Sequence, residues 1–131
     1  MSIGGARDGR AARILVVDDE PVVAAILADT PAADGHRVAT ARDGVGALGR
    51  LRAEGFDAVL SDIHMPGLDG IGLYRAVADM QPALTHHFVL VTGSSLTPET
   101  QQFLAETGVL VLEKPLDLRE VRSVVRRLLG R

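Results

Sequence analysis

Residues 14–21 read ILVVDDEP, a run of four apolar side chains that leads into three consecutive carboxylates and a proline. Three of the four apolar residues are β-branched, which favours a buried β-strand. Adjacent carboxylates repel one another, and packing does not offset that repulsion. We therefore expect this strand to deliver its acids to a place where a positively charged group binds.

The same pattern, a short apolar strand followed by a segment of helical length, repeats along the chain. β-Branched runs predict strands at residues 13–17, 37–41, 57–61, 87–92 and 109–112. Helices are predicted from Glu20–Pro21 onward, at 43–54, at 70–80, from an N-cap at Thr97 and from an N-cap at Asp117. Near-continuous apolar strands separated by helices predict a parallel sheet covered on both faces, which is a doubly wound α/β sandwich.

Length and composition indicate a single globular domain. The chain has 131 residues, of which 47% are hydrophobic and 24% charged. The net charge of −3 gives no sign of a nucleic-acid-binding surface, and the absence of cysteine excludes disulfides and thiolate metal sites. No apolar run approaches the roughly 20 residues of a membrane span. We expect residues 1–12 to form a flexible N-terminal arm, residues 13–130 to form the domain, and the protein to be cytoplasmic.

Proline and glycine interrupt two of the predicted helices. Pro31 lies inside the first one, so that helix should stop or kink near Thr30. Residues 44–49, GVGALG, match the G-x-G-x-x-G pattern of dinucleotide-binding turns. That pattern belongs to the strand that opens the unit at the switch point, whereas this one follows the second strand, so dinucleotide binding is disfavoured.

Polar side chains follow the predicted strands where each strand ends. Asp18 and Asp19 come after the first strand and Asp62 after the third, while Thr92 ends the fourth and Lys114 follows the fifth. Open α/β sheets bind ligands at the carboxyl ends of their strands, so these side chains should converge. Carboxylates suit Mg²⁺, and a lysine with a threonine hydroxyl suits phosphate oxygens. The group fits phosphoryl chemistry.

Four segments, VVDDEP, SDIHMPGLDG, VTGSS and LEKPLD, together resemble the receiver domain of two-component response regulators. They follow the family's order and spacing and span about residues 13–130. The resemblance implies a flavodoxin-like (βα)5 fold with a five-stranded parallel sheet of order 2-1-3-4-5. It also implies a regulatory phosphoacceptor that assists its own phosphotransfer and autodephosphorylation, either as a single-domain regulator or as the receiver of a hybrid kinase.

The resemblance assigns the metal-binding residues one by one. Asp19 and Asp62 would bind Mg²⁺ directly, and Asp18 would help through a water molecule. The backbone carbonyl of His64 would complete the protein ligands. Asp62 would also be the phosphoacceptor, taking a phosphoryl group from a phosphohistidine on a sensor histidine kinase or a histidine phosphotransfer protein.

The residues that would contact the phosphoryl group are Lys114 and Thr92. Lys114, followed by a cis bond to Pro115, would pair with phosphoryl oxygens, and Thr92 would move to hydrogen-bond one of them. That movement would shift the 93–97 loop and the next helix, and it would change a surface formed with the last strand and last helix. A downstream protein or a second copy would read this surface, giving a monomer or a phosphorylation-dependent dimer.

Three further positions would modulate the reaction or the readout. The side chains of His64 and Ser94 would flank the phosphoryl group and gate the hydrolytic water, although an exposed loop histidine is the ordinary alternative for His64. Val111 stands where many receivers carry an aromatic switch residue, so an aromatic rotamer flip is excluded. No helix-turn-helix and no basic surface is evident, so we expect no direct contact with nucleic acid or membrane.

Each site residue also has an ordinary structural explanation. Asp18 and Asp19 could cap a helix, Asp62 could start a turn, Thr92 could end a strand and Lys114 could be an exposed lysine. All of these explanations would have to hold at once. Two other functions stay open: a pseudo-receiver that never takes phosphate, and a small Mg²⁺ phosphohydrolase, which the lack of a second acid two residues after the acceptor disfavours.

Overall fold

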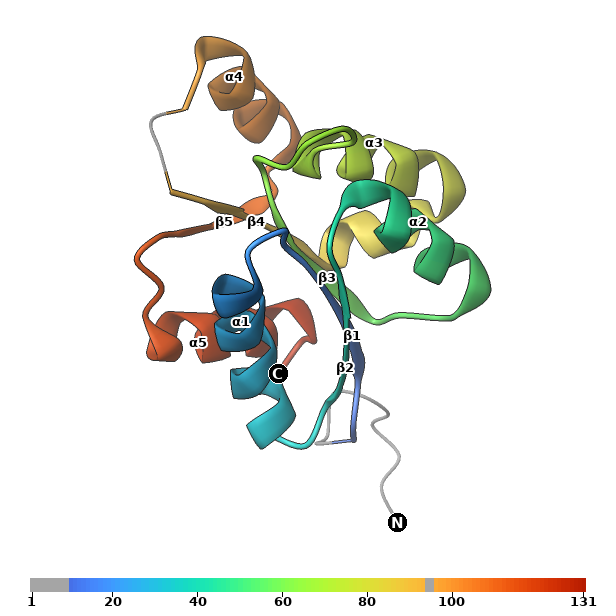
Figure 1. Ribbon diagram of the computed structural model, residues 1–131, viewed down its shortest axis with the longest axis vertical. Helices are drawn as coiled ribbons and strands as arrows, with labels where there is room; N and C mark the ends of the chain where they lie inside the picture. The colour runs from blue at the N-terminus through green and yellow to red at the C-terminus, as the bar shows by residue number, and fades with distance from the viewer. Residues whose placement is uncertain (1–9, 94–95) are drawn as a thin grey trace.

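The computed structural model describes residues 10–93 and 96–131, which form alternating strands and helices (Figure 1). The strands are β1 (Arg13–Val17), β2 (Arg37–Ala41), β3 (Ala58–Asp62), β4 (Phe88–Thr92) and β5 (Leu110–Glu113). The α-helices are α1 (Pro21–Ala33), α2 (Gly44–Ala53), α3 (Gly70–Met80), α4 (Pro98–Thr107) and α5 (Leu118–Leu128). A 3₁₀-helix, η2 (Pro82–His87), precedes β4 and was not expected from the sequence.

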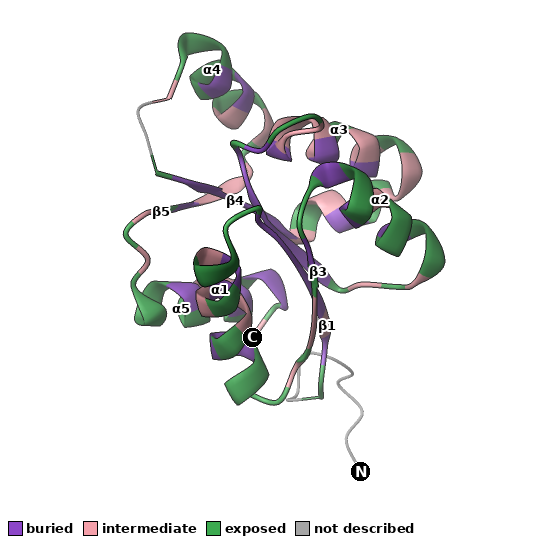
Figure 2. Ribbon diagram, in the orientation of Figure 1, coloured by how far each residue is buried: buried purple, intermediate pink, exposed green. Residues whose placement is uncertain are grey.

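The five strands form one parallel sheet in the order β2-β1-β3-β4-β5, as predicted. β3 and β4 are buried at every position, and β1 at every position but its first, because each is covered on both faces and paired on both edges. β2 and β5 are the edge strands and are only partly buried. Figure 2 shows the buried central strands between helices whose outer faces are exposed.

Two layers of helices cover the sheet. α1 and α5 pack on one face through Leu27, Val121 and Val125, against the strand residues that point toward them. The other face carries α2, α3 and α4, whose buried apolar residues are Ala47, Leu51, Leu73, Val77 and Phe103. Alternate strand residues point to opposite faces, so each face of the sheet contributes apolar side chains to the core beneath its own helices. The result is a three-layer sandwich with two cores.

The helix starts follow the predicted capping residues. The hydroxyl of Thr97 accepts a hydrogen bond from the backbone N–H of Thr100 at 3.1 Å, and the carboxylate of Asp117 accepts one from Arg119 at 2.8 Å. These bonds satisfy donors that the first helical turn leaves without partners. Both predicted N-caps are therefore confirmed.

α1 departs from its prediction at Pro31. The sequence predicts a stop or kink near Thr30, but the helix continues through Pro31 to Ala33. Proline in this last turn removes a single donor, and the carbonyls beyond it keep their partners, since the N–H of Asp34 donates to the carbonyls of Thr30 and Pro31. The helix therefore ends three residues beyond Thr30, and the other predicted outcome, a kink at this position, stays a prediction.

Ala12, the last residue of the predicted N-terminal arm, packs against the domain. Ala12 is fully buried, its N–H donates to Nδ1 of His36 at 3.0 Å, and its carbonyl accepts from the N–H of Arg37 at 2.8 Å. The rest of the predicted arm up to residue 9 lies outside the described residues. Packing and hydrogen bonds thus tie Ala12 to the start of β2.

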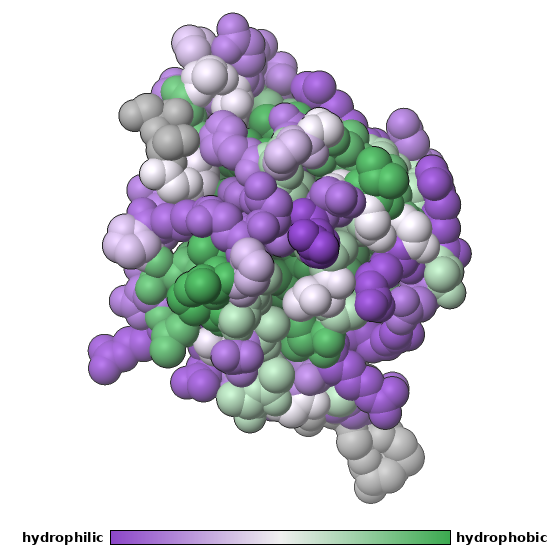
Figure 3. Space-filling view, in the orientation of Figure 1, coloured by the Kyte–Doolittle hydropathy of each residue, from purple (hydrophilic) through white to green (hydrophobic). Residues whose placement is uncertain are grey.

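On the face shown in Figure 3, hydrophilic residues predominate, and hydrophobic residues gather over α1 and also toward α2 and α3. Val22 on α1 is 73% exposed. Among the described residues, no helix is both long and apolar enough to cross a membrane.

Candidate functional site

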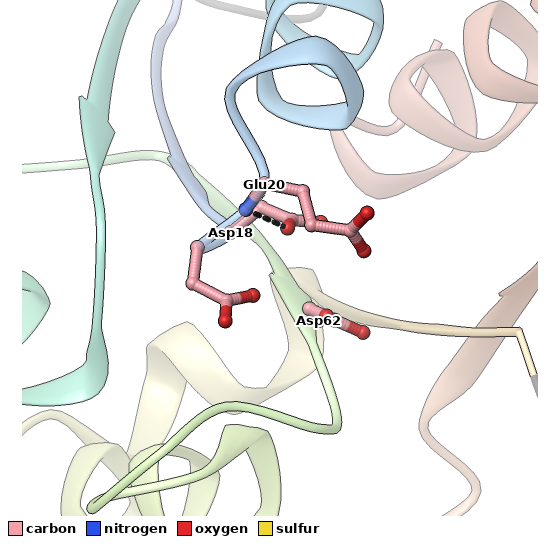
Figure 4. Close-up of side chains that lie close together, drawn as sticks. Asp18, Glu20 and Asp62 are labelled. Atoms are coloured by element: carbon pink, nitrogen blue, oxygen red, sulfur yellow. Dashed lines mark hydrogen bonds between the residues drawn. The ribbon is translucent and has the colours of Figure 1, made fainter.

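Four carboxylates meet at the carboxyl end of the sheet. Asp18, Asp19 and Glu20 follow β1, Asp62 ends β3, and each offers a carboxylate oxygen within 4.8 Å of the others. Figure 4 shows Asp18, Glu20 and Asp62 converging from these two strands. Asp18 and Asp62 are buried, whereas Asp19 and Glu20 are exposed. The cluster therefore has a buried floor and an open rim.

The backbone holds Asp18 in place through two hydrogen bonds that leave one of its carboxylate oxygens unused. Its N–H donates to the carbonyl of Ala41, and its Oδ1 accepts from the N–H of Glu20 at 2.8 Å. Its other oxygen, Oδ2, is buried and has no hydrogen-bond partner among the described residues. An unpartnered buried carboxylate oxygen is costly, so a bound cation or its water fits this position. Carboxylate oxygens are hard ligands, and they suit Mg²⁺ when water molecules and phosphate oxygens complete its coordination.

The end of β3 and the start of α3 lie unusually close together. The N–H of Gly70 donates to the carbonyl of Ile63 at 3.0 Å. A Cβ atom at position 70 would lie 2.3 Å from the carbonyl oxygen of Asp62. No side chain fits there, so glycine lets α3 begin directly against the strand that carries Asp62.

Lys114 supplies the positive charge of the site. Its Nζ lies 3.7 Å from Oδ2 of Asp62 and 3.4 Å from Oε1 of Glu20. Its backbone N–H donates to the carbonyl of Thr92 at 2.8 Å, and its bond to Pro115 is cis, as expected. Glu20 was not among the predicted site residues, although it is the third acid of the ILVVDDEP run.

The charges of the cluster shift one another's pKa. Burial raises the pKa of Asp18, and repulsion from Asp62 adds to the rise against the opposing N–H of Glu20. Burial also raises the pKa of Asp62, against the opposing charge of Lys114 and the backbone N–H of His64. Burial alone would lower the pKa of Lys114, but the carboxylates around it outweigh that effect and raise it. Both buried acids are therefore costly to ionise without a further cation.

A groove of about 670 Å³ lies beside the lysine, between β4, β5 and α4. Thr92, which is buried, and Val111 both line it with Lys114. The remaining lining residues described are Gly93, Leu96, Gln101 and Glu113. The valine thus lies next to the predicted phosphoryl contacts, in the space where a larger switch side chain would fit.

The structure brings together most of the predicted site residues. Asp18, Asp19 and Asp62 meet at the strand ends with Lys114, and His64 is exposed beside Asp62. Ser94 lies outside the described residues.

Comparison with known proteins agrees with this geometry. Residues 14–126 match the family of the response regulator receiver domain. The chain is a response regulator receiver domain. The resemblance seen in the sequence is therefore confirmed.

Relatives of this receiver domain include both kinases and transcriptional regulators. The chain is 40% identical over 112 residues to the sensor histidine kinase RcsC of Salmonella typhimurium, covering 86% of this chain and 12% of the kinase. It is 30% identical over 124 residues to the probable transcriptional regulatory protein TcrX of Mycobacterium tuberculosis, covering 95% of this chain and 52% of that protein. The chain thus spans only a part of the length of these relatives.

Solved receiver domains share the fold over nearly their whole length. The receiver domain of a signal transduction histidine kinase from Syntrophus aciditrophicus is 31% identical with a TM-score of 0.80, covering 92% of this chain and 91% of that chain. The chemotaxis protein CheY4 of Vibrio cholerae is 28% identical with a TM-score of 0.79, covering 91% and 99%. The predicted flavodoxin-like fold is confirmed.

Proposed function

We propose that this receiver takes a phosphoryl group from a phosphohistidine onto Asp62. The observation that carries the proposal is the position of the Asp62 carboxylate, buried at a strand end, 3.7 Å from the ammonium of Lys114 and beside three further acids. An oxygen of Asp62 attacks phosphorus while the P–N bond breaks and its electron pair stays on the donor imidazole. The product is an acyl phosphate on Asp62.

Mg²⁺ is the proposed cofactor. Asp19, Asp62 and the backbone carbonyl of His64 would hold it, and Asp18, with its unpartnered buried oxygen, would bind one of its waters. The ion would supply positive charge to the transferring phosphoryl group. Without it, the carboxylates would repel the incoming phosphate and one another.

The side chains around Asp62 would complete the reaction. Lys114 would exchange its carboxylate contacts for phosphoryl oxygens, and Thr92 would donate its hydroxyl to another of them. His64, exposed at the mouth of the site, would influence the access of water, which attacks phosphorus and returns the free Asp62 carboxylate with inorganic phosphate. Ser94 is proposed as its counterpart on the other side.

The signal would leave through the groove beside Lys114. Movement of Thr92 toward the phosphoryl group would draw the following loop and α4 with it. Val111 leaves this groove open, so the change would appear on the surface of α4, β5 and α5 without an aromatic flip. A kinase or phosphotransfer protein would be the donor, and a downstream protein or a second copy would read the altered surface.

Phosphorylation by a small phosphodonor tests the assignment. Wild type, Asp62→Asn and Asp79→Asn are incubated with acetyl phosphate and Mg²⁺, and intact masses are measured. Asp79 is an exposed carboxylate on α3 and serves as the matched control. Wild type and Asp79→Asn should each gain one phosphoryl group, and Asp62→Asn none. Equal labelling of all three would contradict the role of Asp62, and no labelling of any would favour a pseudo-receiver.

A further inference from the structure

The outer surface of α5 is a groove made almost entirely of arginine. Its volume is about 500 Å³, and it is lined by Arg119, Arg122, Ser123, Arg126, Arg127 and Arg131. The residues of α5 on the opposite side of the helix, Val121 and Val125, are buried in the core beneath it. The expectation that the chain has no basic surface is therefore wrong, because its net charge averages over an acidic site and this basic helix.

Few of these charges are compensated within the domain. Arg122 pairs with Asp34 at 2.9 Å, the one ion pair found for this set among the described residues. Arg131 donates to the backbone carbonyl of Arg10, while its Nε is buried without a hydrogen-bond partner in that same part of the chain. Arg119, Arg126 and Arg127 are exposed. The groove thus presents guanidinium donors in excess of the acceptors around it.

The helix dipole does not account for this arrangement. Arginines in the last turn of a helix are favoured by its negative end, which explains Arg126 and Arg127. Arg119 lies in the first turn, where a positive charge is unfavourable. Arg119, Arg122 and Arg126 follow the three- and four-residue spacing that puts side chains on one helix face. The helix dipole therefore does not explain the row along its whole length.

The size of the groove limits what it can bind. Arg119 and Arg126 are about 10 Å apart along the helix axis, at 1.5 Å per residue. An extended peptide covers that length in about three residues, with alternate side chains on the same side. A nucleic-acid interface of a single module needs several hundred Å², and an overall charge of −3 opposes a long polyanion. Guanidinium groups bind carboxylates in pairs of parallel hydrogen bonds, which matches a short acidic segment.

We propose that the arginine groove of α5 binds a short, extended acidic segment of a partner protein, with glutamate or aspartate side chains at alternate positions. The groove lies on the outer face of α5, and none of its lining residues belongs to the acidic cluster at the strand ends. Binding should therefore occur in the unphosphorylated protein, so it can be tested whether or not Asp62 accepts a phosphoryl group.

The test is a fluorescence anisotropy titration at low salt. The probe is a short fluorescein-labelled peptide of alternating glutamate and serine, and a peptide with glutamine in place of glutamate is its neutral counterpart. Wild type is compared with Arg119→Gln/Arg126→Gln and with Arg42→Gln/Arg52→Gln, which loses the same charge at exposed positions away from α5. Circular dichroism checks that all three are folded.

We expect wild type and Arg42→Gln/Arg52→Gln to bind the acidic peptide and not the neutral one. Binding should weaken about tenfold in Arg119→Gln/Arg126→Gln, and it should weaken further as salt is added. No binding by wild type, or equal weakening in both variants, would overturn the proposal. So would tighter binding of a single-stranded oligonucleotide of equal charge, or sedimentation that shows these two arginines holding two copies of the chain together.

Discussion

The two halves of the acidic site are held by very different amounts of packing. Asp18 and Asp62 stand at the ends of β1 and β3, which are paired on both edges and buried almost throughout. Lys114 follows β5, an edge strand with one buried residue, and Thr92, at the end of the buried strand β4, leads into the segment before α4.

α4, which borders the second half, buries little more than Phe103, whose ring meets the edge of Tyr74 at a centroid distance of 5.2 Å. The half that would accept the phosphoryl group is fixed, and the half that would report it is lightly attached. A switch needs both, since the acceptor must be preorganised while the reporting element must move at low cost.

The largest expected difference is in the free energy of unfolding, when one leucine is truncated on β3 and another on α4. Leu60 on β3 is fully buried, so Leu60→Ala should lower the free energy of unfolding by about 3 kcal/mol. Leu104 on α4 is partly buried, so Leu104→Ala should cost only about 1 kcal/mol. Urea denaturation measures both. Similar losses in the two variants would mean that α4 is packed as firmly as the centre of the sheet.

Replacement of Asp19, the exposed aspartate after β1, should weaken metal binding without lowering the stability of the metal-free protein. Asp19→Asn should weaken Mg²⁺ binding by on the order of a hundredfold, because it would remove one of the proposed direct ligands. In the absence of metal, the variant should be as stable as wild type or more stable, since a like charge beside Asp18 and Asp62 is gone. Isothermal titration and thermal melting give the two values. A metal-free variant that melts well below wild type would make Asp19 a structural residue.

The lightly attached half should respond to a phosphoryl mimic through Thr92. With Mg²⁺ and beryllofluoride, amide hydrogen exchange in α4 should change by about tenfold in wild type. It should stay nearly constant in Thr92→Ala, because this variant lacks the hydroxyl that is proposed to hydrogen-bond the phosphoryl group. Thr85→Ala, on η2, is the matched control and should behave as wild type. Changes confined to residues 63–70 would show that the signal leaves by another face.

The smallest effect is expected on the pH dependence of stability, at the N-terminal end of β1, where His36 accepts a hydrogen bond from Ala12. Burial lowers the pKa of His36 below its usual value of 6.5, and the positive charge of Arg131 acts in the same direction. Below pH 6.5 the unfolded chain then binds more protons at this position than the folded chain, so stability falls as the pH falls. Protonation of Nδ1 would also remove the acceptor for Ala12.

His36→Asn keeps an acceptor and does not titrate. Its melting temperature should therefore fall less than that of wild type between pH 7 and pH 5. Parallel curves for the two proteins would remove His36 from the acid sensitivity of the domain.

The sequence predicted the elements and the strand-end residues because both follow from local pattern. Parallel strands bring their carboxyl ends to one edge, so Asp18, Asp62 and Lys114 could be placed together before any coordinates. The contact between Glu20 and Lys114 could not, since it depends on side-chain conformations of residues far apart in the chain. The length of α1 was misjudged because the cost of a proline depends on how near the helix end lies.

The arginine groove was missed for a different reason. The spacing of Arg119, Arg122 and Arg126 is readable in the sequence as one face of a helix. A net charge for the whole chain conceals it, because acids at the strand ends cancel arginines on α5. Charge counted per helix face would have revealed the groove.

Gly70 has a consequence for how this protein can vary. In a library in which every position is randomised, position 70 should retain glycine, because even the methyl group of alanine would collide with the backbone of Asp62 and Ile63. Gly49, in the interior of α2, has nothing within 4 Å of the place where a Cβ would lie, so the same exchange there should be accepted and enriched. Gly70 and Gly49 cannot be told apart by residue type in the sequence, but the structure forbids a side chain at the first and has room for one at the second.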